Sequence, residues 1–314
     1  MGRVGKFMRA EKLPSSLKNS IRDKNSYQIL ALPDLHIPTD MDLKEMILQS
    51  RILKEIDHII LLGDNVACYG EEEEYRALNE FLKRLPLSYT ALNGNHEFMF
   101  RLQKFSSQTY GKVWERNNLI ERKLQLERFY TFFQLKEHFW SEKISRILYL
   151  FYTIGNDESE KIEILPKSGE GYLQNILKNL ASSRIDKVII FCHAPLKGSE
   201  IDGFQYYNEN ATPFIYLQNE TFQLVEKSGV NFYWFSGHIH LNPSHPMALG
   251  RKVRENLYQV NCPPSWKFSR KILADVVPKR YEEFHSVIIN IIHDKITLRL
   301  YDWLKETFVL EMEL

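Results

Sequence analysis

Five short apolar segments of the chain each run directly into a cluster of Asp, Asn or His residues. Their length and their content of β-branched residues are typical of buried strands. Segments with helical periodicity separate them, at 43–55, 72–84, 173–181 and 220–228. Such alternation predicts an α/β fold, in which ligands bind at the carboxyl ends of the strands. The strands are expected at 27–32, 58–62, 87–92, 188–191 and 230–235.

The clusters at these strand ends carry residues that bind metals. Each one alone is ordinary turn chemistry, since Asp, Asn and Gly are frequent in turns. Together they hold five of the ten histidines of the chain. Independent turns would not concentrate histidine in this way, so we expect the clusters to form one site. The candidate site residues are Asp34, His36, Asp64, Asn95, His96, His193, His238 and His240.

The donor atoms of this set narrow the choice of metal. Carboxylates, imidazoles and an amide oxygen form a mixed nitrogen and oxygen ligand field, which suits Mn, Fe, Zn or Co better than Ca. Three protein ligands and a water satisfy one catalytic zinc, and the set here is large enough for two ions. Two ions ~3.5–4 Å apart share a bridging ligand, and a carboxylate is suited to that position.

The order of the motifs resembles that of the calcineurin-like metallophosphoesterases. The resemblance extends from residue 27 to residue 303 and implies a four-layer α/β/β/α sandwich of two mixed sheets flanked by helices, with a helical insertion. The motifs that carry it are Asp34-x-His36, Gly63-Asp64, Gly94-Asn95-His96-Glu97, His193 and Gly237-His238-x-His240.

This resemblance implies a ligand set for each of two divalent or trivalent metal ions. Asp34, His36 and His240 would bind one ion, and Asp64 would bridge the pair. A hydroxide held between the ions would be the nucleophile for in-line attack on phosphorus.

The other ion would be bound by Asn95, His193 and His238 according to the same resemblance. His96, the neighbour of Asn95, would point at the phosphate instead. There it would stabilise charge in the transition state or protonate the leaving oxygen. His96 and Asp64 are therefore the expected catalytic residues.

The second motif departs from one subfamily in a way that bears on the substrate. It reads Gly-Asp-Asn-Val-Ala at 63–67 and lacks the Asp-Arg-Gly continuation of the Ser/Thr phosphoprotein phosphatases. We therefore expect a metal-dependent phosphoric ester hydrolase with a slight preference for a phosphodiester, such as a cyclic or other small nucleotide. The alternatives are a phosphomonoesterase, a nuclease acting on DNA or RNA, and a non-catalytic scaffold that keeps the fold.

The segment 98–146 follows the third motif and is helix-prone and aromatic. Residues 101–150 contain ten Lys or Arg and five Glu. This composition fits an amphipathic insertion whose aromatics form their own core. It also fits a basic, aromatic lid that selects a nucleotide by stacking and charge. After it, 147–154 and 161–165 are expected to form a hairpin.

Domain organisation and charge complete the predictions. Residues 1–26 form a basic extension, with seven basic and two acidic residues in the first 25, and 27–314 form the phosphoesterase domain. A net charge of +1 gives no bulk affinity for polyanions, so a small phosphate ester is favoured over nucleic acid as the partner. The sequence leaves the oligomeric state open.

The remaining residue patterns indicate no membrane association and no disulfide framework. The most apolar run, 147–154, is too short to span a bilayer of ~30 Å, and the three cysteines lack zinc or redox spacing. We expect a cytoplasmic protein in which Cys68 and Cys192 are packed as small hydrophobic residues. Five histidines outside the motifs are expected to be packed or on the surface: His58, His138, His245, His285 and His293.

Overall fold

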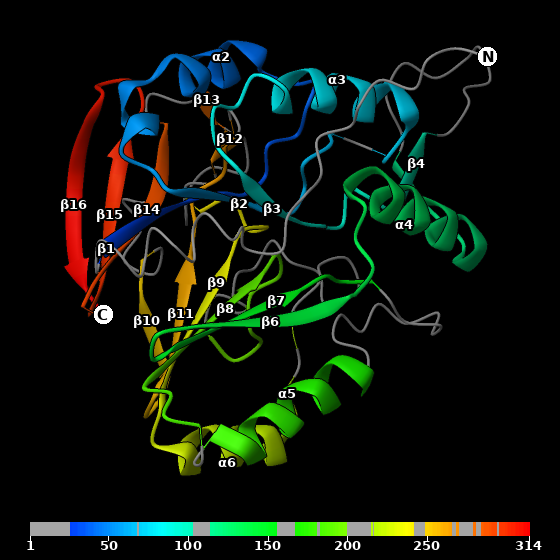
Figure 1. Cartoon of the computed structure of the whole chain (residues 1–314). Helices are drawn as coiled ribbons and strands as arrows, with labels where there is room; N and C mark the ends of the chain where they lie inside the picture. Colours follow the sequence, from blue (N-terminus) through cyan, green and yellow to red (C-terminus); the bar gives the residue numbers. More distant parts are fainter. Residues whose placement is uncertain are drawn as a thin grey trace.

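A computed structural model gives the structure of the chain. It describes residues 26–67, 69–102, 114–155, 167–180, 183–199, 215, 217–241, 249–265, 268–269, 279–280, 284–293 and 295–314. Two six-stranded sheets lie at the centre, with helices on their outer faces (Figure 1). The expected sandwich of two mixed sheets flanked by helices is confirmed.

The first sheet joins a parallel half to an antiparallel half. Its strand order is β16-β15-β14-β1-β2-β3, in which β1, β2 and β3 are parallel and β14, β15 and β16 form an antiparallel meander. The strands are β1 (Ser26–Leu32), β2 (His58–Leu62), β3 (Tyr89–Leu92), β14 (His285–Ile292), β15 (Lys295–Asp302) and β16 (Thr307–Glu313).

The second sheet is parallel in its middle and antiparallel at both edges. Its strand order is β10-β11-β9-β8-β7-β6. The strands are β6 (Phe139–Ile144), β7 (Ile147–Tyr152), β8 (Lys187–Cys192), β9 (Asn231–Ser236), β10 (Arg251–Arg254) and β11 (Leu257–Asn261). Two short pairs complete the strands: β4 (Phe100–Leu102) with β5 (Trp114–Arg116), and β12 (Phe268–Ser269) with β13 (Lys279–Arg280).

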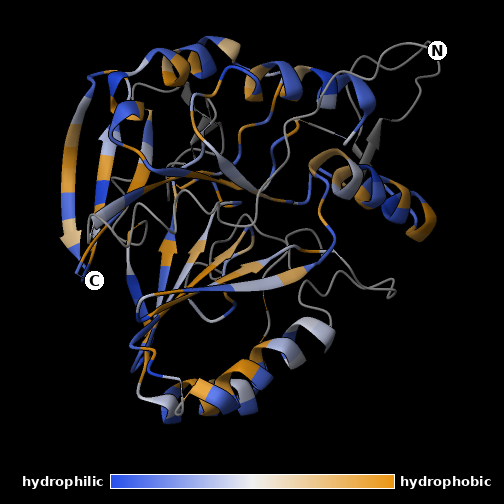
Figure 2. Ribbon diagram, in the orientation of Figure 1, coloured by the Kyte–Doolittle hydropathy of each residue, from blue (hydrophilic) through white to orange (hydrophobic). Residues whose placement is uncertain are grey.

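The two sheets pack face to face through alternate residues of their strands. In β1, Ile29 and Ala31 face the second sheet, while Leu30 and Leu32 face the helices of the first. Side chains of a strand point alternately to its two faces, so a strand buried on both sides is apolar throughout. This explains why the strand segments read as continuous apolar runs, which appear as orange stretches in Figure 2.

Helices cover the outer faces of both sheets, as the periodicity predicts. α2 (Met41–Gln49), the 3₁₀ helix η1 (Arg51–Lys54) and α3 (Glu72–Leu82) lie on the first sheet. α5 (Lys167–Leu180) and α6 (Asn219–Ser228) lie on the second. The helix expected over 43–55 is divided because Ser50 has an extended backbone and its hydroxyl accepts a hydrogen bond from the backbone of Ile52.

The segment expected to be a helical insertion is largely built into the sandwich. It contains β4, β5, β6 and α4 (Leu119–Phe133). Phe129 and Phe133 of α4 belong to the core beneath α2 and α3, and Trp140 of β6 lies between the sheets. The expectation of a separate aromatic core was wrong, because these side chains extend the two existing cores. β6 forms the hairpin with β7, whereas 161–165 lies outside the described residues, as does the extension 1–25.

Within the part of the chain that the structure describes, no helix is both long enough and apolar enough to cross a membrane.

Candidate metal centre

Five loops at the carboxyl ends of parallel strands hold the candidate site residues. Backbone hydrogen bonds from Asp34 to Gly63 (2.9 Å) and from His36 to Asp64 (2.9 Å) extend the pairing of β1 and β2 beyond the strands. In the second sheet, the Gly237 N–H donates to the carbonyl of His193 (3.0 Å). Each sheet thus fixes its own loops.

A hydrogen-bonded contact joins the loop after β9 in the second sheet to the loop after β1 in the first. The backbone N–H of His238 donates to both carboxylate oxygens of Asp34, at 3.1 and 3.2 Å. At Gly237, a Cβ would lie 2.7 Å from a carboxylate oxygen of Asp34, so only glycine allows this approach. The loop after β9 therefore meets the loop after β1 at the site.

The backbone is in the left-handed region at five of the eight candidate residues. This conformation costs an L-residue about 1–2 kcal/mol and is held only when the surroundings enforce it. Here the hydrogen bonds between the loops do so, and the strain is concentrated where the donor atoms converge. The residues are Asp34 (φ 53°), His36 (φ 48°), Asp64 (φ 50°), His238 (φ 73°) and His240 (φ 49°).

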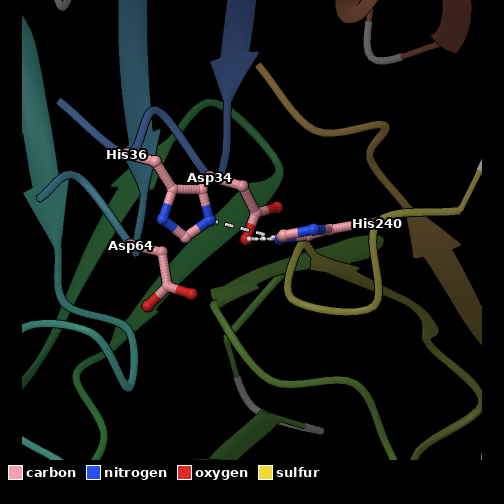
Figure 3. Close-up of side chains that lie close together, drawn as sticks. All are labelled: Asp34, His36, Asp64 and His240. Carbon is pink, nitrogen blue, oxygen red and sulfur yellow. Dashed lines mark hydrogen bonds and ion pairs between the residues drawn. The ribbon is translucent and has the colours of Figure 1, made fainter. Parts of the chain in front are cut away.

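The first donor group comprises Asp34, His36, Asp64 and His240, whose ligand atoms all lie within 4.8 Å of one another. The Nε2 atoms of His36 and His240 are 3.3 Å apart, and His240 Nε2 is 3.1 Å from Asp34 Oδ1. Figure 3 shows the three residues from the first sheet with His240 entering from the opposite side. All four are buried.

The second donor group comprises Asp64, His193 and His238. The Asp64 Oδ2 atom is 3.2 Å from His193 Nε2, and Asn95 Oδ1 is 3.3 Å from the same nitrogen. Asp64 belongs to both groups. The structure therefore brings together all seven residues that the resemblance implies as ligands, in the two sets that it implies.

The geometry of both donor groups fits a metal ion. Donor atoms bound to one ion at about 2.0–2.2 Å lie about 3–3.5 Å from each other. The pairs His36–His240, His240–Asp34 and Asp64–His193 meet this spacing, at 3.3, 3.1 and 3.2 Å. His193 Nδ1 is 2.9 Å from the carbonyl oxygen of Leu62 and donates its hydrogen there, so Nε2 is the nitrogen directed at the centre. Each group is therefore able to hold a metal ion.

The buried charges of the site depend on one another. Burial alone would raise the pKa of Asp64, but the imidazoles of His193 and His96 hold that pKa well below its ordinary value. Burial works against protonation of His193, yet the Asp64 carboxylate outweighs it and raises the His193 pKa to about 9. Burial, with the nearby His96, lowers the pKa of His36 well below its ordinary value. The charges of Asp64 and His193 are thus coupled, each favouring the ionised form of the other.

His96 lies at the more exposed edge of the centre and outside both donor groups. Its backbone N–H donates to Asp64 Oδ1 (2.8 Å), and its Nδ1 is 2.6 Å from the carbonyl oxygen of Ala67. Its Nε2 lies 3.8 Å from Asp64 Oδ2. Its side chain is 16% exposed and that of Asp64 is 2% exposed, so His96 is the more accessible of the two.

Glu97 is a residue of the site to which the sequence assigned no role. Its buried carboxylate accepts hydrogen bonds from the backbone N–H groups of Asp64 (3.1 Å), Asn65 (2.6 Å) and Gly94 (2.6 Å). Burial and the Asp64 charge raise the pKa of Glu97 to about 7, against the opposing effect of those donors. Glu97 therefore ties the loop after β2 to the loop after β3. The signal was its place beside His96 in the third motif.

Lys44 is a second residue that sequence reasoning missed. It is buried, and its Nζ donates to the carbonyl of Ser265 (3.0 Å), whose own N–H donates to the carbonyl of Pro33 (2.8 Å). This links α2 to the residue before Asp34. A lysine within an amphipathic helix normally lies in solvent, so the sequence offered no signal for this contact.

The other histidines and cysteines lie where packed or surface residues are expected. His58 is buried between the hydroxyls of Ser88 (3.1 Å) and Thr90 (2.9 Å). His285 is buried beside Asp302, and His293 is exposed. Cys192 and Cys262 are buried free thiols. His245 and Cys68 lie outside the described residues.

Solved structures with a similar fold include two proteins of quite different description. A purple acid phosphatase from yellow lupin seeds aligns with a TM-score of 0.60 and 12% identity, covering 92% of this chain and 53% of that protein. GAP50, the anchor in the inner membrane complex of Plasmodium, aligns with a TM-score of 0.50 and 10% identity, covering 92% and 88%. The chain thus spans about half the length of the lupin phosphatase. These likenesses show the fold.

No curated protein matches the sequence significantly. The family model for calcineurin-like phosphoesterases matches residues 27–242, which is 216 of the 314 residues and includes all eight candidate site residues. With the two donor groups at the carboxyl ends of the strands, this match identifies the chain as a member of the calcineurin-like phosphoesterase family.

Proposed function

We propose that this protein hydrolyses a phosphate ester with two metal ions held in the two donor groups. The observation that supports the proposal best is the position of Asp64, whose carboxylate belongs to both groups. A shared carboxylate is the feature that separates a dinuclear site from two independent ones.

Seven side chains would hold the two ions. Asp34, His36 and His240 would bind one of them, and Asp64 would bridge to the other. Asn95, His193 and His238 would complete the second site. Both sets combine nitrogen and oxygen donors, which favours Mn, Fe, Zn or Co. When bound, such ions activate water at neutral pH and neutralise phosphate oxygens.

The residues of the chain itself would act on the phosphate and on the loops around it. His96, at the exposed edge of the centre, would donate a hydrogen bond to the phosphate or a proton to the leaving oxygen. Asp64 would anchor His96 through the hydrogen bond from the His96 backbone (2.8 Å). Glu97 would keep the loops after β2 and β3 in register.

A small phosphodiester, such as a cyclic or other small nucleotide, is the proposed substrate class. The near-zero net charge supports a small substrate over a polymer. The motif 63–67 ends in Ala67 where phosphoprotein phosphatases continue with Asp-Arg-Gly, which disfavours phosphoprotein substrates. Phosphomonoester hydrolysis is the alternative, and the ratio of kcat/KM for the two ester types decides between them.

The compartment and the domain limits belong to the same proposal. The buried free thiols of Cys192 and Cys262 support a reducing compartment, and we propose the cytoplasm. The phosphoesterase domain would comprise residues 27–314 after a basic extension.

Hydrolysis of bis-p-nitrophenyl phosphate and p-nitrophenyl phosphate tests the proposed activity. The protein loaded with Mn, Fe, Zn or Co should hydrolyse at least one of them. Asp64→Asn and His193→Ala should remove metal and activity, whereas Asp186→Asn and His293→Ala, which alter the same residue types away from the site, should change neither. Hydrolysis of neither ester with any of the four metals would refute the proposal.

A scaffold without catalysis is the second candidate function. The fold similarity to GAP50, described as an anchor, favours it, and the intact donor groups argue against it. Metal analysis after loading separates the two. Close to two ions per chain supports the enzyme, and fewer than one ion per chain supports the scaffold.

A further inference from the structure

Helix α4 is hydrogen-bonded to the loop that follows β2. The side-chain amide of Gln125 donates to the carbonyl of Tyr69, and the guanidinium of Arg128 donates to the carbonyl of Gly70. Arg128 also pairs with Glu71, at 3.3 Å. Two consecutive carbonyls of one loop are therefore bonded to side chains one helical turn apart.

A buried amide pair connects the same helix to the loop that follows β3. Gln125 Oε1 accepts a hydrogen bond from Asn117 Nδ2 (2.5 Å). Asn117 Nδ2 also donates to the carbonyl of Phe98 (2.8 Å), and the Asn117 backbone N–H donates to Met99 (2.9 Å). Gln125 and Asn117 are both buried. Gln125 thus donates to the loop after β2 and is linked to the loop after β3 through Asn117.

The loop held by α4 carries the hydrogen-bond acceptor of His96. The carbonyl of Ala67 accepts from His96 Nδ1 at 2.6 Å, and the Ala67 N–H donates to Ile37 at 2.9 Å. Gly70 packs closely against Glu97, the residue that follows His96. A Cβ on Gly70 would lie 2.2 Å from the carbonyl oxygen of Glu97. A shift of this loop would therefore be transmitted directly to the His96 ring.

The acceptor at Nδ1 determines what the other nitrogen of the ring can do. A hydrogen on Nδ1 fixes the ring orientation and turns Nε2 toward Asp64, 3.8 Å away. A side-chain acceptor would be held by its own rotamer, whereas a backbone carbonyl is held only by its loop. The loop after β2 is tied to α4 at Tyr69 and Gly70, two and three residues beyond Ala67 in the chain.

We propose that Gln125, supported by Arg128, is a positioning residue for His96. Gln125 acts on the His96 ring through the loop that carries the carbonyl of Ala67. This inference rests on the proposed function of His96 and assigns α4 the task of orienting that residue. The basic and aromatic segment 98–146 then contributes to the reaction by holding the active-site loop in place.

A double-mutant cycle tests the inference with Gln125→Met, which keeps the side-chain volume and removes both hydrogen bonds. With a phosphate ester that the protein hydrolyses, Gln125→Met should lower kcat about tenfold, with the metal content unchanged. In the His96→Ala background the same change should alter kcat less than about twofold. Tyr130→Phe, which breaks the hydrogen bond of α4 to Thr153 (2.7 Å), is the matched control and should leave kcat unchanged.

Exchange of the His96 Nδ1 hydrogen with water is the readout that needs no activity. Its NMR signal, assigned by its loss in His96→Ala, should exchange about tenfold faster in Gln125→Met and remain unchanged in Tyr130→Phe. Equal losses of kcat in both backgrounds, or unaltered exchange in a folded Gln125→Met protein, would overturn the inference. If the wild type hydrolyses no ester, the proposed function fails, and the exchange measurement still tests the role of Gln125.

Discussion

Among single residues, the buried polar groups around the centre fix the candidate metal ligands and their loops by hydrogen bonds. Glu97 accepts hydrogen bonds from four backbone N–H groups of the loops that carry Asp64 and Asn95. His193 is oriented by Leu62, and the Asp34 carboxylate receives the backbone of His238. The donor atoms of a metal site are only as well placed as the residues behind them.

Replacing Glu97 with Gln should weaken both metal binding and the fold. The amide NH₂ would face backbone donors in place of a carboxylate oxygen, so we expect a loss of about 2 kcal/mol in the free energy of unfolding and a 10–100-fold loss, roughly, in metal affinity. Urea unfolding and metal titration measure the two effects. Glu80→Gln, at an exposed pair with Lys83, is the control. Unchanged metal affinity in Glu97→Gln would contradict the role assigned to Glu97.

His58 should make the fold sensitive to acid. Burial lowers its pKa to about 3, while the unfolded chain keeps the ordinary value of 6.5. Between pH 6.5 and pH 3, His58 therefore binds a proton in the unfolded state but not in the folded state. The stability contributed by neutral His58 is fully present above pH 6.5 and is lost as the pH falls toward 3. The loss amounts to about 2 kcal/mol at pH 5.

Urea unfolding between pH 7 and pH 4.5 checks this for the wild type and for His58→Gln. The variant should lose less stability over that range, whatever its stability at pH 7. His293→Gln, at an exposed histidine, should follow the wild type. Parallel pH profiles for the wild type and His58→Gln would show that another group causes the acid sensitivity.

At the scale of elements, α4 is part of the sandwich and not a separate unit. Its inner face carries Phe129 and Phe133 into the core of the first sheet, and its amides hold the loops at the site. An amphipathic helix takes its stability from the surface that it packs against. Unfolding of α4 should therefore be inseparable from unfolding of the first sheet.

Truncation of Phe129 tests the integration of α4. Phe129→Ala should cost about 3–5 kcal/mol, because it removes a fully buried ring from a packed core. Leu124→Ala, at a side chain 58% exposed on the same helix, should cost less than about 0.5 kcal/mol. Fluorescence and circular dichroism should report one shared unfolding transition. A separate, earlier transition for the helix would contradict the integration of α4.

At the scale of the whole molecule, the site lies where the two sheets meet. The first sheet supplies Asp34, His36, Asp64 and Asn95, and the second supplies His193, His238 and His240. A ligand bound only by the folded state stabilises that state according to its concentration and affinity. Metal bound between the sheets should therefore stabilise the sandwich as a whole.

Removal of metal should lower the unfolding temperature of the loaded protein. At a metal concentration 100 times the Kd, binding contributes about 2.7 kcal/mol, which a chelator would withdraw. Calorimetry with and without chelator measures the change in Tm. Asp64→Asn should show little response to the chelator. An equal response in Asp64→Asn would show that the metal binds elsewhere.

The strands that precede the five clusters, most of the helices and the candidate site residues could be predicted from the sequence, whereas β6, β10 and β16 were not predicted. Apolar runs predict strands buried on both faces, and the clusters after them identify the loops, because both signals are local. The prediction for the segment 98–146 was wrong, because aromatic residues such as Phe129 and Trp140 are equally suited to a separate core or to an existing one.

The groups that support the site could be identified only once the chain was folded. The carboxylate of Glu97, the buried Lys44 and the amide of Gln125 act on residues far away in the chain. Their partners are backbone groups, which every residue possesses and which leave no mark in a sequence. Periodicity and motifs depend on the type of side chain at each position. The direction of a backbone carbonyl depends instead on how the chain packs around it.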